Sequence, residues 1–140
     1  MKNNIKKTIK EGAHKAKKNV VVTGGAGFIG HHLVNELVHR GYEVFVIDNL
    51  VTGKKEDVHK DAHIHVVDIG NLDLLKKTFE IIGSIDYVFH LACRPRVQFS
   101  IDFPDQTNDT NITGTLNVLI AAIMYFANFL RVNTLLKVPS

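Results

Sequence analysis

Apolar and polar positions fall into short blocks along the chain, and these blocks predict strands and helices in turn. Apolar runs rich in Val and Ile predict strands at about residues 19–23, 43–48, 62–67 and 86–91. Between and after these runs, apolar residues recur at helical spacing, which predicts helices over about 28–40, 72–82 and 105–127. The polar segment 49–61 and the segment with Pro95 and Pro104 are expected to be loops.

The turn between the first strand and the first helix is rich in glycine, and residues 23–30 have the sequence Thr-Gly-Gly-Ala-Gly-Phe-Ile-Gly. The first N–H groups of a helix lack intrahelical partners and the helix dipole favours an anion there, so this turn suits a pyrophosphate. Gly24 and Gly25 permit a tight turn. Gly27 lets phosphates approach the backbone, and Gly30 lets the helix lie close to the strand.

The second strand ends at Asp48, eighteen residues after the last glycine of the turn. A carboxylate at this point accepts hydrogen bonds from the adenosine ribose and repels a 2′-phosphate. No Arg follows where a 2′-phosphate would need one, and Lys54 and Lys55 are expected to face solvent. Together these features are typical of the dinucleotide-binding fingerprint and predict NAD rather than NADP. The alternative is a glycine turn without a ligand.

The alternation of strands and helices favours right-handed crossovers and a parallel sheet. We therefore expect an α/β partial Rossmann fold, with strand order 3-2-1-4 and flanking helices. The chain is expected to divide into a basic N-terminal extension (1–18), an NAD-binding Rossmann half-domain (19–127) and an atypical end (128–140). Within that end, residues 132–138 fit either a short strand or the end of a helix.

Composition is ordinary for one globular domain, with 45% hydrophobic and 22% charged residues among 140. The charge, however, is unevenly placed. Residues 1–18 hold seven Lys and one Glu, a net charge of +6, so the other 122 residues sum to −3. A basic tail could attract nucleic acid or an anionic surface. Because it has no aromatic residue to stack on bases, we expect a solvated extension, with no nucleic-acid or membrane partner.

The single cysteine, Cys93, cannot form an internal disulfide, and a reducing cytoplasm is the simplest setting. The tail has no apolar stretch like that of a signal peptide, and no apolar run approaches membrane-spanning length. The pairs His31–His32 and His63–His65 come without the other ligands of a metal site, so no metal is expected.

Four further blocks accompany the glycine turn: Asp-Asn-Leu-Val-Thr-Gly (48–53), Asp-Ile (68–69), His-Leu-Ala-Cys (90–93) and Asn-Ile-Thr-Gly-Thr-Leu-Asn-Val-Leu (111–119). In this order and spacing, the chain resembles the extended short-chain dehydrogenase/reductases. The resemblance is to the NAD-dependent nucleotide-sugar epimerases and dehydratases, and most to the UDP-glucose and UDP-N-acetylhexosamine 4-epimerases.

The resemblance implies a cofactor-binding role for residues at the glycine turn and at the strand ends. They are Gly24, Gly27, Phe28, Ile29, Gly30, Asp48, Asn49, Asp68, Ile69, Leu91, Ala92, Cys93 and Asn111. In this scheme Phe28 and Ile29 would lie along the pyrophosphate, and Asp48 with Asn49 would hold the adenosine ribose.

The same resemblance places Asp68 and Ile69 beside the adenine, with the carboxylate accepting from its exocyclic amine. Leu91, Ala92 and Cys93 would line the path toward the nicotinamide ribose. Asn111 would brace either the chain after the fourth strand or the cofactor itself.

Several residues near the fourth strand allow more than one interpretation. Cys93 stands where the family usually has Ala or Gly, and we expect a buried apolar side chain rather than a reactive thiol. His90 is expected to be a packed strand residue rather than a catalytic base. Arg94 and Arg96 either reach a substrate phosphate or belong to a surface loop.

The family's chemistry uses a Tyr-x-x-x-Lys pair with a nearby Ser or Thr, in which tyrosinate accepts a proton from a sugar hydroxyl while hydride passes to NAD. The tyrosines here are Tyr42, Tyr87 and Tyr125, and none has Lys four residues on. Tyr87 is expected inside a core strand. The chain is therefore predicted to be an N-terminal half without catalytic residues, the catalytic part and the substrate domain being absent.

Three functional interpretations remain open. The chain is the NAD-binding portion of a nucleotide-sugar 4-epimerase or dehydratase without turnover by itself, a stand-alone NAD-binding module, or a non-functional gene fragment. NAD is the expected partner, with a UDP-sugar only if the missing half is supplied. A homodimer through the helix 105–127 is also expected, because Ile112, Leu116, Leu119 and Ile123 recur there at helical spacing.

Overall fold

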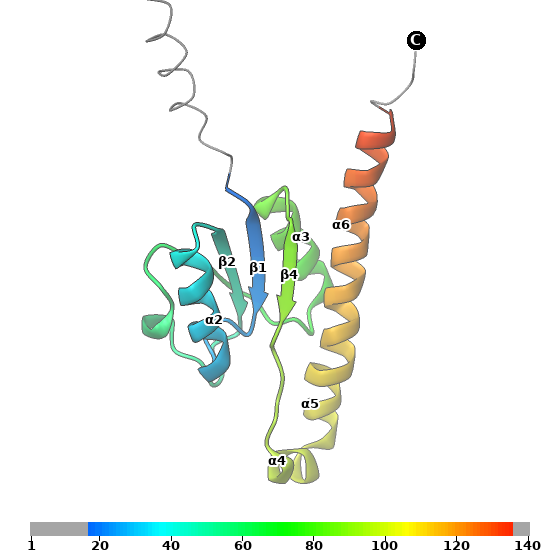
Figure 1. Ribbon diagram of the computed structural model, residues 1–140. Coiled ribbons are helices and arrows are strands. Elements are labelled where there is room, and N and C mark those ends of the chain that lie inside the picture. Colours follow the sequence, from blue (N-terminus) through cyan, green and yellow to red (C-terminus); the bar gives the residue numbers. More distant parts are fainter. Residues whose placement is uncertain (1–16, 136–140) are drawn as a thin grey trace, which may run out of the picture.

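The computed structural model describes residues 17–135, with side chains described through Tyr125 (Figure 1). The elements, in chain order, are β1 (Asn19–Thr23), α2 (Phe28–His39), β2 (Glu43–Asp48), the 3₁₀ turn η1 (Lys55–Asp57), β3 (His63–Val66), α3 (Leu72–Ile82), β4 (Tyr87–His90), α4 (Val97–Asp102), α5 (Pro104–Asn108), the π-helical turn η2 (Asp109–Gly114) and α6 (Thr115–Leu135). The basic tail expected over 1–18 lies outside the described residues except for Lys17 and Lys18, which are exposed.

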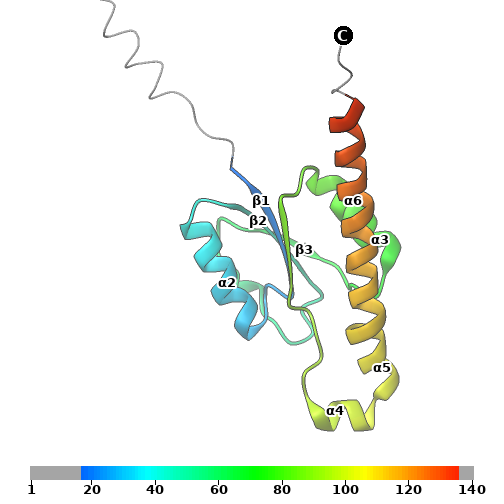
Figure 2. The ribbon, with the colours of Figure 1, turned by 45° about the vertical axis from the view of Figure 1, so that its right-hand side comes forward.

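The four strands form one parallel sheet in the order β3-β2-β1-β4, which confirms the predicted topology. Figures 1 and 2 show three layers, with α2 on one face of the sheet and α3 and α6 on the other. Helices on both faces bury the central strands, which explains why β1 and β2 are almost continuously apolar in sequence.

Each face of the sheet has its own hydrophobic core, because successive strand residues point to opposite faces. Under α2, the buried side chains are those of Val20, Val22, Val34, Leu37, Val44 and Val46. Under α3 and α6, they are those of Val21, Ile47, Ile69, Leu75, Phe79, Ile82, Ile85, Val118 and Ala121. The apolar residues that recur at helical spacing in α2 and α3 therefore face the sheet, as expected.

β4 is the edge of the sheet, and this corrects the expectation that Tyr87 lies in a core strand. Tyr87 is 44% exposed and Phe89 is 40% exposed, whereas Val88 between them packs against the core under α3 and α6. Tyr87 and Phe89 pair in register with Val20 and Val22, so they point to the face that carries α2. Within residues 17–125, α2 does not reach across to cover them.

Helix α3 begins and ends at the residues predicted for it. The side chain of Asn71 accepts a hydrogen bond from the backbone N–H of Leu74 at 3.0 Å, which satisfies one free donor of the first turn. Gly83 follows the last helical residue with φ of 83°, a left-handed conformation that favours glycine.

The segment after β4 is more helical than expected. The predicted loop contains α4, and the helix expected from residue 105 starts with Pro104 in the first turn, where its missing N–H costs nothing. The π-helical turn η2 then separates α5 from α6, and Gly114 within it packs against the side chain of Ile69. Helix α6 continues through Leu135, so residues 132–135 are helical, while 136–138 lie outside the described residues.

No helix in the described part of the chain is long and apolar enough to cross a membrane.

Candidate functional site

The carboxyl ends of β1, β2 and β4 meet the N-terminus of α2 and the segment α4–η2 at one edge of the sheet (Figures 1 and 2). In open α/β sheets, ligands bind at this edge, where the strand order reverses on either side of β1. Two connected hollows lie here. We call them the inner pocket, of about 80 Å³, and the outer groove, of about 1070 Å³.

The glycine turn forms the floor of both hollows, because Gly24 and Gly27 line each of them. Gly24 has φ of 71°, and a Cβ there would lie 2.6 Å from the backbone nitrogen of Ala92. A Cβ on Gly30 would lie 2.0 Å from the carbonyl oxygen of Gly24. These glycines therefore let the turn, the start of α2 and the end of β4 come together, as the sequence predicted.

Asp48 holds the end of β2 against the glycine turn. Its Oδ2 accepts a hydrogen bond from the backbone N–H of Ala26 at 3.0 Å, and its Oδ1 accepts one from Leu50 at 2.8 Å. The side chain is 8% exposed and lines the inner pocket. Each carboxylate oxygen has a further lone pair, so Asp48 retains acceptor capacity toward a ligand hydroxyl.

Asn49 connects the end of β2 with the segment after β3. Its side-chain amide donates to Oδ2 of Asp68 at 2.8 Å, while the N–H of Gly70 donates to Oδ1 at 2.7 Å. Asn49 lines the inner pocket, but Asp68 lies just behind it, outside the lining. The two predicted adenosine residues are therefore coupled to each other directly.

Ile69 is buried and lines the inner pocket. Its position depends on Asn117, whose side-chain amide donates to the carbonyl oxygens of Ile69 at 2.9 Å and Gly70 at 3.1 Å. Sequence analysis missed Asn117. A signal was available, because a polar residue on the buried face of an amphipathic helix needs a partner.

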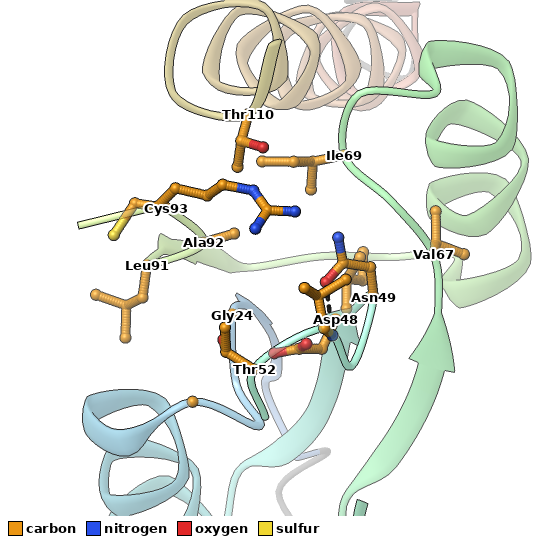
Figure 3. Close-up of a pocket in the computed structure, with 14 residues that line it drawn as sticks. Gly24, Asp48, Asn49, Thr52, Val67, Ile69, Leu91, Ala92, Cys93 and Thr110 are labelled. Atoms are coloured by element: carbon orange, nitrogen blue, oxygen red, sulfur yellow. Dashed lines mark hydrogen bonds between the residues drawn. The ribbon is translucent and has the colours of Figure 1, made fainter. Parts of the chain in front are cut away.

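Figure 3 shows the labelled pocket residues arranged around one space, with Thr110 above it and Gly24 and Thr52 below. Thr52, Val67 and Thr110 line the inner pocket and were not predicted. Lys54 and Lys55 are exposed and do not line it, as expected.

The outer groove is lined by more exposed side chains. Phe28 is 82% exposed and Ile29 is 69% exposed, and both stand at the rim beside the glycine turn. Leu91, Ala92 and Cys93 line both hollows, as expected for the path after β4. Cys93 is nevertheless exposed, so the expectation of a buried apolar side chain is wrong. The chain leaves the sheet after His90; Leu91 and Ala92 still pack against the two cores, whereas Cys93 lies at the hollows and is exposed.

His90 joins β1, β4 and α6 through hydrogen bonds. Its Nδ1 lies 2.6 Å from Oγ1 of Thr23, and its Nε2 lies 2.9 Å from Oγ1 of Thr115. The Thr115 hydroxyl donates its proton to the carbonyl oxygen of Asn111 at 2.8 Å, so we assign the imidazole proton to Nε2. Burial lowers the pKa of His90, which favours this neutral form.

Asn111 lies in the π-helical turn η2 and holds the chain after β4. Its Oδ1 accepts from the backbone N–H of Arg94 at 2.7 Å, and its Nδ2 donates to the carbonyl oxygen of Arg94 at 3.1 Å. The first of the two predicted roles, bracing the chain after β4, is therefore present in the structure. π-helical turns inside helices are frequent at functional sites.

Arg94 and Arg96 occupy different parts of the site. Arg94 lines both hollows, and its guanidinium lies 4.7 Å from the centre of the Phe99 ring. Arg96 lines the outer groove alone. Within the described residues, no group of His, Cys, Asp and Glu is arranged to hold a metal ion.

The groups that line the two hollows follow one another in an order that suits an extended ligand containing phosphate. A buried carboxylate stands at one end, helix N–H groups and glycines lie in the middle, and an open groove lies at the other end. This is the layout that a dinucleotide needs, with ribose on the acid and pyrophosphate at the helix N-terminus.

Comparisons with known proteins agree with this layout. The sequence profile of the NAD dependent epimerase/dehydratase family matches residues 20–135. UDP-glucuronic acid decarboxylase 1 of Arabidopsis thaliana is 38% identical over 125 residues, which are 88% of this chain and 28% of that protein. A putative UDP-glucose 4-epimerase of Methanocaldococcus jannaschii is 39% identical over 100 residues, which are 71% of this chain and 32% of that protein.

Solved structures are similar in the same region. UDP-glucose 4-epimerase of Thermotoga maritima, determined with UDP-glucose, superposes with a TM-score of 0.74 at 40% identity. The enzyme of Thermus thermophilus, in complex with NAD, gives a TM-score of 0.72 at 40% identity. In both cases the match covers 76% of this chain and 34% of the other. The chain thus spans about a third of the length of the relatives it matches, and it belongs to the NAD dependent epimerase/dehydratase family.

Proposed function

We propose that residues 19–127 are the NAD-binding portion of a nucleotide-sugar 4-epimerase or dehydratase, and that this chain has no turnover by itself. The observation that carries the proposal is the buried carboxylate of Asp48, hydrogen-bonded to the glycine turn at the bottom of the inner pocket. The structure determined with NAD at 40% identity supports the same cofactor.

The residues present fit NAD in chemistry and in order. Asp48 would accept hydrogen bonds from the adenosine ribose, and Asn49 would hold Asp68 beside the adenine. The N–H groups at the start of α2 would bind the pyrophosphate, with Phe28 and Ile29 alongside. Leu91, Ala92 and Cys93 would line the path of the nicotinamide ribose, and Asn111 would keep that path in place. When bound, NAD supplies a hydride acceptor.

A preference for NAD over NADP follows from charge. A 2′-phosphate on the adenosine ribose would approach the Asp48 carboxylate, and like charges repel. Lys54 and Lys55, the nearest downstream cations, are exposed and outside the lining. Neither is placed to compensate that repulsion.

Isothermal titration tests the cofactor. The 140-residue chain is expected to bind NAD more tightly than NADP, and Asp48→Ala is expected to weaken NAD binding and narrow the preference. Asp57→Ala is the matched control, because Asp57 is an exposed acid of the neighbouring turn η1 and does not line either hollow. Tighter binding of NADP than of NAD by the unmodified chain would refute the cofactor assignment.

Turnover tests the second part of the proposal. Because no Tyr of the chain has Lys four residues on, incubation with NAD and UDP-glucose or UDP-N-acetylglucosamine is expected to give no sugar interconversion and no NADH absorbance. NAD binding without turnover favours the half-enzyme or a stand-alone NAD-binding module. Absence of NAD binding favours a non-functional fragment. Turnover by the purified chain would contradict the proposal.

We also propose self-association through α6 and the turn before it. Val118 and Ala121 face the core, whereas Ile112, Leu116, Leu119 and Ile123 are exposed at helical spacing. An apolar stripe of this kind on a surface helix favours helix–helix association. Sedimentation at micromolar concentration is expected to show a dimer or larger species in the unmodified chain. Leu119→Lys is expected to shift it toward monomer, whereas a clean monomer of the unmodified chain would overturn this proposal.

A further inference from the structure

Arg94 lies where the two hollows of the site meet. The residues that line both hollows are Gly24, Gly27, Val51, Thr52, Leu91, Ala92, Cys93 and Arg94. Arg94 is the one charged side chain in this shared set. In a dinucleotide, the pyrophosphate joins the two nucleosides, so its place is the junction of an adenosine pocket and a nicotinamide groove.

The charge of Arg94 is available to a ligand. Among the residues that the structure describes, the ion pairs are those of Lys17, Arg40, His59 and His63, and no carboxylate pairs with Arg94. Its guanidinium carbon lies 4.7 Å from the centre of the Phe99 ring, a contact that occupies none of its N–H donors in a hydrogen bond. The N–H donors at its edge remain free to bind phosphate oxygens in the bidentate geometry that Arg favours.

The backbone of Arg94 is held more firmly than a surface loop requires. Asn111 bonds both its N–H and its carbonyl oxygen. Asn111 in turn accepts from Thr115, which accepts from His90 at the end of β4. The start of the Arg94 side chain is thereby fixed relative to the sheet and to η2, which lowers the entropy cost of binding.

We infer that Arg94 is a pyrophosphate-binding residue of the dinucleotide site, and that Asn111 is the residue that positions it. This inference rests on the proposed function, because it assigns a further contact to the same cofactor. It also separates the two arginines of the segment: Arg94 lines both hollows and serves the pyrophosphate, whereas Arg96 lines the outer groove alone and lies away from their junction.

Titration with NAD tests the inference through two matched variants. Arg94→Gln is expected to weaken NAD binding at least about tenfold, equivalent to about 1.4 kcal/mol, because hydrogen bonds to charged groups are strong. Lys54→Gln removes one positive charge from an exposed position that lines neither hollow, and it is expected to leave NAD affinity within about twofold, well under that 1.4 kcal/mol. Arg94→Lys keeps the charge without the planar fork and is expected to fall between the two.

Ligand and salt dependence identify the group that Arg94 contacts. ADP-ribose, which keeps the pyrophosphate and lacks nicotinamide, is expected to lose affinity for Arg94→Gln as NAD does. Adenosine, which lacks the pyrophosphate, is expected to bind the variant and the unmodified chain equally. Raising the NaCl concentration is expected to weaken NAD binding less in Arg94→Gln, because one ionic contact is already missing.

A double-mutant cycle tests the positioning role of Asn111. Asn111→Ala is expected to weaken NAD binding while Arg94 is present and to add little in the Arg94→Gln background, because both changes remove the same contact. Additive effects would show that Asn111 does not act through Arg94. Thermal unfolding of each variant checks that the fold is retained.

The outcomes separate this inference from the proposed function. If the unmodified chain binds NAD and Arg94→Gln binds it equally well, the role of Arg94 is wrong and NAD binding stands. If adenosine affinity falls as much as NAD affinity, Arg94 shapes the pocket and does not bind phosphate, which also overturns the inference. If the unmodified chain binds neither NAD nor ADP-ribose, both proposals fall.

Discussion

The two ends of the site are built in different ways. At the inner pocket, which we propose as the adenosine end, the side chains of Asp48 and Asp68 accept hydrogen bonds from the backbone N–H groups of neighbouring turns. Along the outer groove, which leads to the proposed nicotinamide end, the lining side chains Phe28, Ile29 and Cys93 are exposed. That end is held by a line of side-chain hydrogen bonds from His90 to η2.

This difference shows how each end is held before any ligand binds. Bonds between a carboxylate and backbone N–H groups join the strand ends to their own turns, so the adenosine end is pre-organised by the sheet itself. The nicotinamide end depends on the contact of β4 with α6, in which His90 bonds Thr115, 25 residues later along the chain. We therefore expect substitutions at the first end to affect folding and binding together, and substitutions at the second to have smaller effects on stability.

The largest effect is expected for Gly30→Ala. Its Cβ would lie 2.0 Å from the carbonyl oxygen of Gly24 and 2.7 Å from Cα of Gly25, so backbone atoms must move. Overpacking against backbone is expected to lower the free energy of unfolding by about 3 kcal/mol and to abolish NAD binding. Urea denaturation and NAD titration measure the two effects.

Gly41→Ala is the matched control. Gly41 has φ of 83°, but nothing lies within 4 Å of the Cβ position. The backbone strain alone is expected to cost about 1 kcal/mol, with NAD affinity unchanged. Equal stability losses in the two variants would contradict the close packing inferred at Gly30.

The sequence was a good guide wherever structure is local or periodic. The strand order, the strand positions and the Asn71 and Gly83 ends of α3 follow from apolar spacing and capping residues. The adenosine end was predictable because its parts, the glycine turn and Asp48, belong to consecutive elements and have a fixed spacing.

Asp68→Ala is expected to have a medium effect. It removes the acceptor for the amide of Asn49 and the N–H of Gly70, which is expected to cost about 1 kcal/mol of stability. If the carboxylate also accepts from adenine, NAD affinity falls about tenfold, equivalent to about 1.4 kcal/mol.

Asn71→Ala is the comparison for Asp68→Ala. It removes the cap of α3 at a similar cost of about 1 kcal/mol, but Asn71 lies outside both hollows. The Asn71→Ala variant is expected to bind NAD with unchanged affinity. If the two variants lose stability equally and both keep NAD affinity, Asp68 supports the loop only and the adenosine end is smaller than proposed.

The pH dependence of the free energy of unfolding tests whether the His90 ring is buried and hydrogen-bonded as a neutral imidazole. Burial lowers the pKa of His90 in the folded protein, so the unfolded chain takes up the proton first as the pH falls. The contribution of His90 to the free energy of unfolding is complete at a pH above its pKa in the unfolded chain, about 6.5. It is lost as the pH falls from there through the lower pKa of His90 in the folded protein. One proton changes the free energy of unfolding by at most about 1.4 kcal/mol per pH unit, and the half-buried ring of His90 should contribute less.

Urea denaturation over this pH range is expected to show a smaller slope in His90→Gln than in the unmodified chain. His65 contributes in the same direction, because burial, and then repulsion by His63, lowers its pKa as well. Adding His65→Gln to His90→Gln is therefore expected to reduce the slope further. An unchanged slope in His90→Gln would show that the ring takes up its proton as easily in the folded protein as in the unfolded chain.

The nicotinamide end was predicted less well, for a physical reason. The exposure of Cys93 and the helix α4 depend on where the chain goes after it leaves the sheet, which no periodicity in residues 92–104 records. At the other end of the site, the contacts of Asn117 with Ile69 and Gly70 also join residues far apart in sequence, so spacing alone does not indicate them.

Cys93→Ser gives the smallest expected effect. Experiments at Cys93 test the difference between the adenosine end and the nicotinamide end most directly. Because the thiol is exposed at the junction of the two hollows, replacing sulfur by oxygen is expected to change the free energy of unfolding by less than about 0.5 kcal/mol.

In the unmodified chain, the thiol is expected to react with a disulfide reagent as fast as in the unfolded chain, and NAD is expected to slow the reaction. A slow reaction without NAD would mean that Cys93 is buried, so the two ends would be equally closed before ligand binds. If adenosine slowed the reaction of the thiol as strongly as NAD does, Cys93 would lie at the adenosine end. The division of the site into a closed end and an open end would then fail.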